Sequence, residues 1–204
     1  MTNFERRFIA TNELRAQKEG EPPVIAGYAA MFNSLSYDLG GFREILAPGC
    51  FSNALAKDTL NVRCLVNHDD NLILGSTLAK TLTVREDSKG LYFEALINPE
   101  VTYARDHAEN VRRGDISHCS FGFTMFGDYQ RGEAWSEVPE GFTLRTITEV
   151  NELFDVSIVV FPAYVSTVVN VRSLNQYRES LAAPVRNPLD LKLRKLKLYK
   201  TLYL

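Results

Sequence analysis

Residues 117–123, SHCSFGF, place a histidine, a cysteine and a serine side by side, ahead of two phenylalanines separated by a glycine. A serine or cysteine becomes a nucleophile when an adjacent base takes its proton, and histidine titrates closest to neutral pH. In an extended strand Ser120 and Gly122 share one face, which leaves that face small and open to a substrate. Cys119 then points with the phenylalanines into a core, where free cysteines are unreactive. Ser120 is therefore the better nucleophile candidate, although a serine in a strand is most often structural.

The chain contains only three histidines, which limits the choice of a general base. His68 follows an apolar run in LVNHDDN, where a predicted strand meets a loop and a rigid element can hold an exposed side chain. His107 lies among charged residues of a predicted helix, so we expect it to face solvent. His118 shares the face of Ser120 if the strand begins that early. His68 is the first candidate, although most lone loop histidines are ordinary surface residues.

A serine–histidine pair also needs a group that orients the imidazole and stabilises its cation. Asp155 interrupts an apolar run in ELFDVSIVV, downstream of Glu149 and Glu152. A carboxylate in a buried strand is costly unless it has a partner. Asp155 therefore has either a functional role or a salt bridge to an arginine, and the sequence favours neither.

The elements that must position these residues are mostly strands. A β-hairpin is predicted within 78–97, with its loop at 86–90 and Gly90 where the backbone must be permissive. A helix is predicted over 100–113, ended by Gly114, and a shorter one near 49–57. Further strands are predicted at 24–32, 59–69, 120–130, 141–150 and 152–161. The fold class is α+β, a β-rich barrel-like or sandwich-like domain with a few helices.

The amino-acid composition limits the classes of partner and cofactor that we expect. The chain has 204 residues, 45% of them hydrophobic, and a formal net charge of -2, so neither nucleic acid nor a membrane is an expected partner. Three cysteines without CxxC spacing indicate no zinc site and a reducing compartment, and we expect no cofactor or metal. The N-terminal residues are charged too often for a signal peptide. We therefore expect a soluble, cytoplasmic protein.

The residue pattern of the sequence changes near residue 172. Residues 173–204 contain two prolines and end in leucines interleaved with lysine and arginine. We therefore divide the chain into a domain at 1–172 and a basic, leucine-rich C-terminal tail at 173–204. The pattern favours a solvated tail or the edge of a packed helix over a dedicated docking segment.

The order of several segments resembles the prohead protease family of tailed bacteriophages, capsid maturation serine proteases with a fold like that of the herpesvirus assemblin proteases. The resemblance covers about residues 5–172 and lies in AGYAAMFN, FREILAPGCF, LVNHD followed by LGST, LTVREDSKGLYFEALI, GDISHCSFGF and ELFDVSIVVFPAY. It implies a serine endopeptidase with His68 as the base and Ser120 as the nucleophile. The third, acidic position falls on Asp155, with Glu149 as the rival.

The resemblance also implies substrates and a location in the infected cell. The expected substrates are the phage scaffold, the scaffold segment of the major capsid protein, and the protease itself, all inside the assembling prohead in the host cytoplasm. The tail would then dock on scaffold or be removed by self-cleavage. A homodimer, as in the herpesvirus proteases, stays open.

Three other hypotheses remain. An esterase or amidase would use the same serine and histidine, but no G-x-S-x-G elbow surrounds Ser120. A cysteine peptidase would use Cys119 or Cys64. A non-catalytic assembly module would retain a protease-like fold and bind capsid or scaffold.

Overall fold

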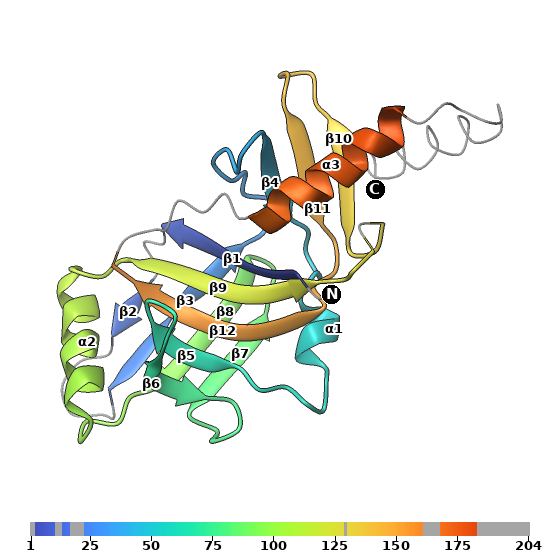
Figure 1. Cartoon of the computed structure of the whole chain (residues 1–204). Helices are drawn as coiled ribbons and strands as arrows, with labels where there is room; N and C mark the ends of the chain where they lie inside the picture. The colour runs from blue at the N-terminus through green and yellow to red at the C-terminus, as the bar shows by residue number, and fades with distance from the viewer. Residues whose placement is uncertain (1–2, 11–13, 17–22, 129, 161–167, 183–204) are drawn as a thin grey trace.

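The computed structural model describes residues 3–10, 14–16, 23–128, 130–160 and 168–182 (Figure 1). Within these ranges twelve strands form three sheets. The five-stranded sheet contains, in spatial order, β1 (Asn3–Ala10), β9 (His118–Met125), β12 (Glu152–Val159), β5 (Arg63–Val66) and β6 (Asp69–Ser76). The four-stranded sheet contains β2 (Arg15–Ala16), β3 (Val24–Met31), β8 (Gly90–Leu96) and β7 (Leu82–Glu86). The three-stranded sheet contains β10 (Glu133–Glu137), β11 (Thr143–Ile147) and β4 (Phe42–Leu46).

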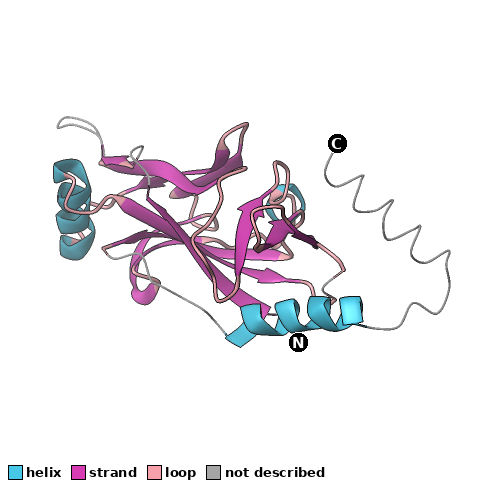
Figure 2. Cartoon of the chain, turned by 90° about the horizontal axis from the view of Figure 1, so that it is seen from above, coloured by secondary structure: helices cyan, strands magenta, loops and turns pink. Residues whose placement is uncertain are grey.

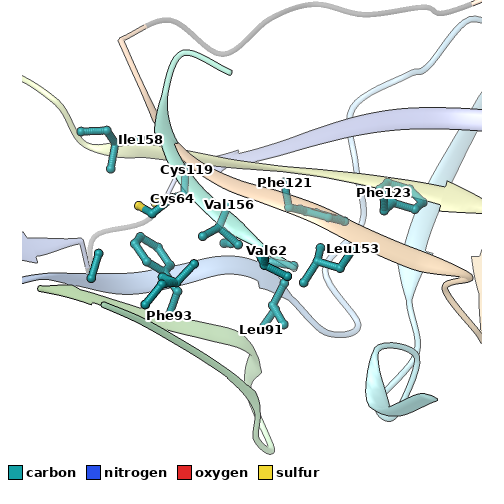
Figure 3. Packing of buried hydrophobic residues seen from close by; sticks show 14 of the residues in the cluster. Val62, Cys64, Leu91, Phe93, Cys119, Phe121, Phe123, Leu153, Val156 and Ile158 are labelled. Carbon is teal, nitrogen blue, oxygen red and sulfur yellow. The ribbon is translucent and has the colours of Figure 1, made fainter. Parts of the chain in front are cut away.

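The two larger sheets face each other, and the main core lies between them. β3 packs against β9 and β1, and β8 packs against β6. Figure 3 shows the side chains that β9, β12 and β8 send into this core, among them Phe121, Val156 and Phe93, all fully buried. The predicted β-rich α+β class is confirmed, but none of the three described sheets closes on itself as a barrel.

Three helices lie within the described ranges. α1 (Ser52–Leu55) is short, and α2 (Thr102–Arg113) buries Ala104, Ala108 and Val111. Gly114 ends α2 in the left-handed conformation with φ 84°, as its sequence position predicts. The predicted helices near 49–57 and over 100–113 are therefore confirmed. Among the described residues, none of the helices combines the length and the apolar character needed to cross a bilayer.

Several predictions about strands need correction. The strand expected over 59–69 is confined to β5, and the loop expected after it is a turn of only two residues, because β6 begins at Asp69. Strands β1, β2, β4, β6 and β10 were not predicted, since polar residues interrupt their apolar alternation. The hairpin of β7 and β8 is confirmed.

Gly90 is required for a different reason from the one its place in the hairpin suggests. Its φ is not in the left-handed region, so the loop does not need a permissive backbone there. A Cβ at this position would overlap the carbonyl oxygen of Ala30, at an irregularity in the pairing of β3 with β8. Gly90 thus allows close approach of two backbones.

α3 (Val168–Ala182) covers the three-stranded sheet, across which it runs in Figure 1, and Figure 2 shows the helix on one side of the strands. Leu174 and Tyr177 of α3 pack against Phe42 and Trp135 in a second, smaller core. The Tyr177 and Trp135 rings stack with centroids 5.6 Å apart. α3 thus runs across the boundary drawn at 172/173, while residues 183–204 lie outside the described residues. The division into domain and tail stays a prediction.

A buried cluster of five charged side chains joins the five-stranded and three-stranded sheets. Arg145 of β11 is fully buried and donates to Glu5 of β1, at 2.7 and 2.9 Å, and to Glu44 of β4, at 2.9 Å. Arg7 of β1 donates to Glu44 through two nitrogens, at 2.6 and 2.8 Å, and also pairs with Glu5. Glu133 of β10 completes the cluster by accepting from Arg145.

Charge compensation explains how these groups are tolerated inside the protein. Burial opposes ionisation of Glu5, but the charges of Arg145 and Arg7 outweigh it and leave the pKa of Glu5 below its ordinary value. Burial raises the pKa of Glu133, which Arg145 only partly offsets. Removing one member would leave an excess of buried charge of one sign, and these ion pairs tie β1 to β4 and β11.

We expect Arg145→Met to lower the free energy of unfolding by about 3–5 kcal/mol, because it leaves three buried carboxylates, Glu5, Glu44 and Glu133, with Arg7 as the only cation of the cluster. Urea unfolding measures the loss. Arg105→Met is the matched control, since Arg105 pairs with Asp106 in a half-exposed contact at 3.5 Å, and we expect a change within about 0.5 kcal/mol. Equal losses in both variants would show that burial of the cluster does not matter.

Candidate active site

Three adjacent strands of the five-stranded sheet bring Ser120, His68 and Asp155 into one hydrogen-bonded chain. The His68 Nδ1 lies 2.6 Å from the Asp155 Oδ1, and the His68 Nε2 lies 2.6 Å from the Ser120 Oγ. Ser120 lies on β9 and Asp155 on β12, which pair antiparallel, and His68 follows β5, which pairs in parallel with β12. The three residues singled out from the sequence therefore meet within hydrogen-bonding distance.

A two-residue turn places His68. β5 and β6 pair up to Val66 and Asp69, so only Asn67 and His68 make the connection. Both have positive φ, 52° for Asn67 and 58° for His68, as in a type I′ hairpin turn. Asparagine and histidine are among the residues that tolerate this conformation best. The turn therefore projects the imidazole from the end of a rigid strand.

A β-bulge at Phe154 determines where Asp155 points. Leu153 pairs with Phe123 in the core, but the next pair along the ladder is Asp155 with Gly122, so Phe154 is an extra residue. Side chains alternate along a strand, and without the extra residue Asp155 would face the core opposite Phe121. The bulge shifts this alternation and turns Asp155 to the face that carries Ser120.

The open face predicted beside Ser120 is in fact filled. Ser120 is only 3% exposed. A Cβ at Gly122 would overlap the Asp155 carboxylate and would lie 3.0 Å from the Phe4 ring. The missing side chain of Gly122 thus makes room for the carboxylate, and not for a substrate. The ring of Phe4 pairs with Phe154, with centroids 5.6 Å apart, on the same side of the sheet.

Ser157 is a member of the site that sequence reasoning missed. Its side chain is fully buried and lies on the same face as Asp155, directly across the ladder from Ser120. The Ser157 hydroxyl donates to the Asp155 Oδ1 at 2.7 Å and lies 3.2 Å from the His68 Nδ1. The signal was present in the alternation of Asp155 and Ser157, two polar residues in an apolar strand.

The Ser120 hydroxyl has a second acceptor in the backbone of β1. It donates to the carbonyl oxygen of Arg7 at 2.7 Å, in addition to its contact with His68. A hydroxyl carries one proton, so Arg7 and His68 compete for it. The buried charge cluster that holds the Arg7 side chain therefore also fixes the backbone group beside the serine.

The other candidates from the sequence do not join the hydrogen bonds between Ser120, His68 and Asp155. Glu149 was the alternative to Asp155 as the acidic partner of His68. Its carboxylate instead accepts from Asn53 at 3.0 Å and lies 3.8 Å from Arg131. His118 belongs to β9 and contacts Ser117 at 3.4 Å. His107 is half-buried and not fully solvent-facing, because its Nδ1 donates to the carbonyl oxygen of Tyr103 in α2.

The cysteines lie in the core, as predicted for Cys119. Cys50, Cys64 and Cys119 are all fully buried, and Figure 3 shows the latter two among apolar side chains. Burial raises the pKa of each thiol, with smaller contributions from the Glu86 charge at Cys50 and the Asp155 charge at Cys64. Among the described residues, no cluster of three His, Cys, Asp or Glu side chains could hold a metal.

We expect Gly122→Ala to lower the free energy of unfolding by about 1–3 kcal/mol, because its Cβ overlaps the Asp155 carboxylate. Urea unfolding of Gly122→Ala, of Asp155→Ala and of the double variant forms a mutant cycle. The double variant should lose less stability than the sum of the single variants, since the overlapping group is gone. Strict additivity would contradict the close packing of the two residues.

We expect the folded protein to resist thiol reagents at pH 8, because the raised pKa of each buried cysteine keeps it in the unreactive protonated form. Ellman's reagent should titrate three thiols in urea and none rapidly in the native state. A fast-reacting native thiol would revive the cysteine peptidase hypothesis.

The sequence comparisons match this chain to one family. A family model described as caudovirus prohead serine protease matches residues 10–180. The prohead protease of Enterobacteria phage HK97 is 30% identical over 152 residues, which are 74% of this chain. The chain spans about 60% of the length of that curated relative. The solved structure of the bacteriophage T4 capsid assembly protease aligns with a TM-score of 0.44 and 13% identity, covering 78% of this chain and 98% of the other.

Proposed function

Because the chain belongs to the caudovirus prohead serine protease family, we propose that it is a serine endopeptidase with Ser120 as nucleophile, His68 as general base and Asp155 as the orienting acid. One observation carries this assignment. The imidazole of His68 lies 2.6 Å from both the Ser120 hydroxyl and the Asp155 carboxylate. Nucleophile, base and orienting group within hydrogen-bonding reach of one another are the requirement for an activated serine.

In this mechanism the Nδ1–H of His68 donates to Asp155, which leaves the Nε2 free to accept the Ser120 proton. The serine oxygen attacks a peptide carbonyl carbon as its proton moves to His68. His68 then gives that proton to the leaving amine, and water hydrolyses the acyl-enzyme by the same route in reverse. Asp155 fixes the tautomer and stabilises the imidazolium that forms in each step.

The surroundings of Asp155 support this role. The hydroxyl of Ser157 donates to the Oδ1 that faces His68, which leaves the carboxylate less freedom to rotate. Arg7 has the opposite influence, since its carbonyl oxygen competes with His68 for the Ser120 proton. The reactive state is the one in which Ser120 donates to His68.

The proposed substrates follow from the family. Prohead proteases act during capsid maturation, so we propose that this chain cleaves scaffold, or the scaffold segment of the major capsid protein, inside the prohead. Self-cleavage and a docking role for the tail at 173–204 belong to the same proposal.

Co-expression with the capsid or scaffold protein, followed by intact mass of every product, tests the assignment. We expect shortened products with the unaltered chain and full-length partners with Ser120→Ala. On a peptide spanning the cleavage site so found, Asp155→Asn should lower kcat by about 10⁴-fold, because the amide favours the wrong tautomer of His68.

Ser117→Ala is the matched control, because Ser117 is an exposed neighbour three residues away, and it should cleave normally. Cleavage that survives in Ser120→Ala would contradict the assignment of the nucleophile. An unaltered chain that binds capsid or scaffold without cleaving it would instead favour the non-catalytic assembly module.

A further inference from the structure

The turn that carries His68 is tied to β12 at its backbone. The parallel ladder between β5 and β12 runs from the pair Arg63 and Asp155 to the pair Val66 and Ile158. The N–H of Asn67, the next residue along, donates to the carbonyl oxygen of Ile158 at 2.9 Å. β12 also carries Asp155, so this bond links the turn to the strand of the carboxylate.

The side chain of Asn67 makes a second tie to the same strand. Its Oδ1 accepts from the N–H of Val160, the residue that follows β12, at 3.0 Å. Asn67 therefore holds the end of β12 from two sides, through its own N–H and through its amide oxygen. The next residue in the chain is His68, whose ring lies 2.6 Å from both of its partners.

We propose that the side chain of Asn67 is a positioning residue for the reaction, which sets His68 on Asp155 and Ser120 by clamping the turn to the end of β12. This inference rests on the proposed function. A hydrogen-bonded chain with two contacts of 2.6 Å tolerates little movement of its central ring, and a misplacement of about 1 Å costs about 100-fold in rate. A two-residue turn without this clamp is held to β12 only through its backbone.

A simpler explanation for an asparagine at position 67 is the backbone conformation of the turn. Its φ of 52° is a conformation that asparagine tolerates and that glycine adopts freely. Two substitutions separate the explanations. Asn67→Gly keeps the turn and removes the acceptor oxygen, whereas Asn67→Asp keeps both. Asn33 provides the matched control, because it is an exposed asparagine with nearly the same φ, 54°, outside the site.

The experiment compares these variants in the full chain by two measurements. The first is the rate at which a fluorophosphonate probe labels Ser120, followed by intact mass at the plateau of the pH profile. The second is the ¹H–¹⁵N NMR signal of the His68 Nδ1–H, identified by its loss in His68→Ala. Thermal unfolding of each variant checks that the fold is kept.

We expect Asn67→Gly to slow labelling by about 10-fold to 100-fold and to broaden or shift the Nδ1–H signal toward that of a solvent-exposed imidazole. Asn67→Asp should restore both to near the values of the unaltered chain, and Asn33→Gly should change neither. Labelling and a Nδ1–H signal in Asn67→Gly that match the unaltered chain would overturn the proposal. Equal losses in Asn67→Gly and Asn67→Asp, or a matching loss in Asn33→Gly, would overturn it too.

The two measurements separate this inference from the proposed function. An unaltered chain that keeps the Nδ1–H signal but does not react with the probe would contradict the peptidase assignment. The NMR comparison of the Asn67 variants would then still decide whether Asn67 positions the imidazole.

Discussion

The register between β9 and β12 is the constraint on which the site depends. Ser120 faces Ser157 across this ladder and Asp155 faces Gly122, only because Phe154 is bulged out of the pairing. A shift of one residue would move every side chain of β12 to the opposite face. Asp155 would then lie in the apolar core, where nothing could compensate its charge. The bulge lets one strand send Leu153, Val156 and Ile158 into the core and still present its polar residues on the other face.

Close packing around the carboxylate follows from this register. The Asp155 carboxylate fills the space that a side chain at Gly122 would take. Ser157, on the same strand as Asp155, donates a hydrogen bond to this carboxylate. These contacts leave one orientation for the oxygen that meets His68. An orienting group held in this way needs no rearrangement during a reaction, which is the condition for electrostatic preorganisation. The two hydrogen bonds of Asn67 to the end of β12 restrict the turn that carries His68 in the same way.

The buried charge cluster connects this site to the rest of the molecule. Arg7 uses its side chain in the cluster and its carbonyl oxygen on Ser120, so the packing of β1 against the three-stranded sheet reaches the Ser120 hydroxyl. Such a cluster contributes little net stability compared with apolar packing, but it specifies one arrangement, because any other leaves charges unpaired. β1 is an edge strand, and this specificity fixes its position beside β9.

The sequence by itself determined the residue types of the site. SHCSFGF, LVNHDDN and an aspartate in an apolar strand made Ser120, His68 and Asp155 candidates, since strand periodicity separates Ser120 from Cys119 and a buried carboxylate needs a partner. The family resemblance then implied their roles, with Glu149 as the rival of Asp155. The hairpin and the longer helix were also predictable, because local patterns and a terminal glycine specify them. Only the tertiary structure decided that Asp155 and not Glu149 contacts His68, that Ser157 joins them and that the face beside Ser120 is filled. Each of these depends on a bulge or on pairing between distant segments, and local sequence periodicity carries no information on either.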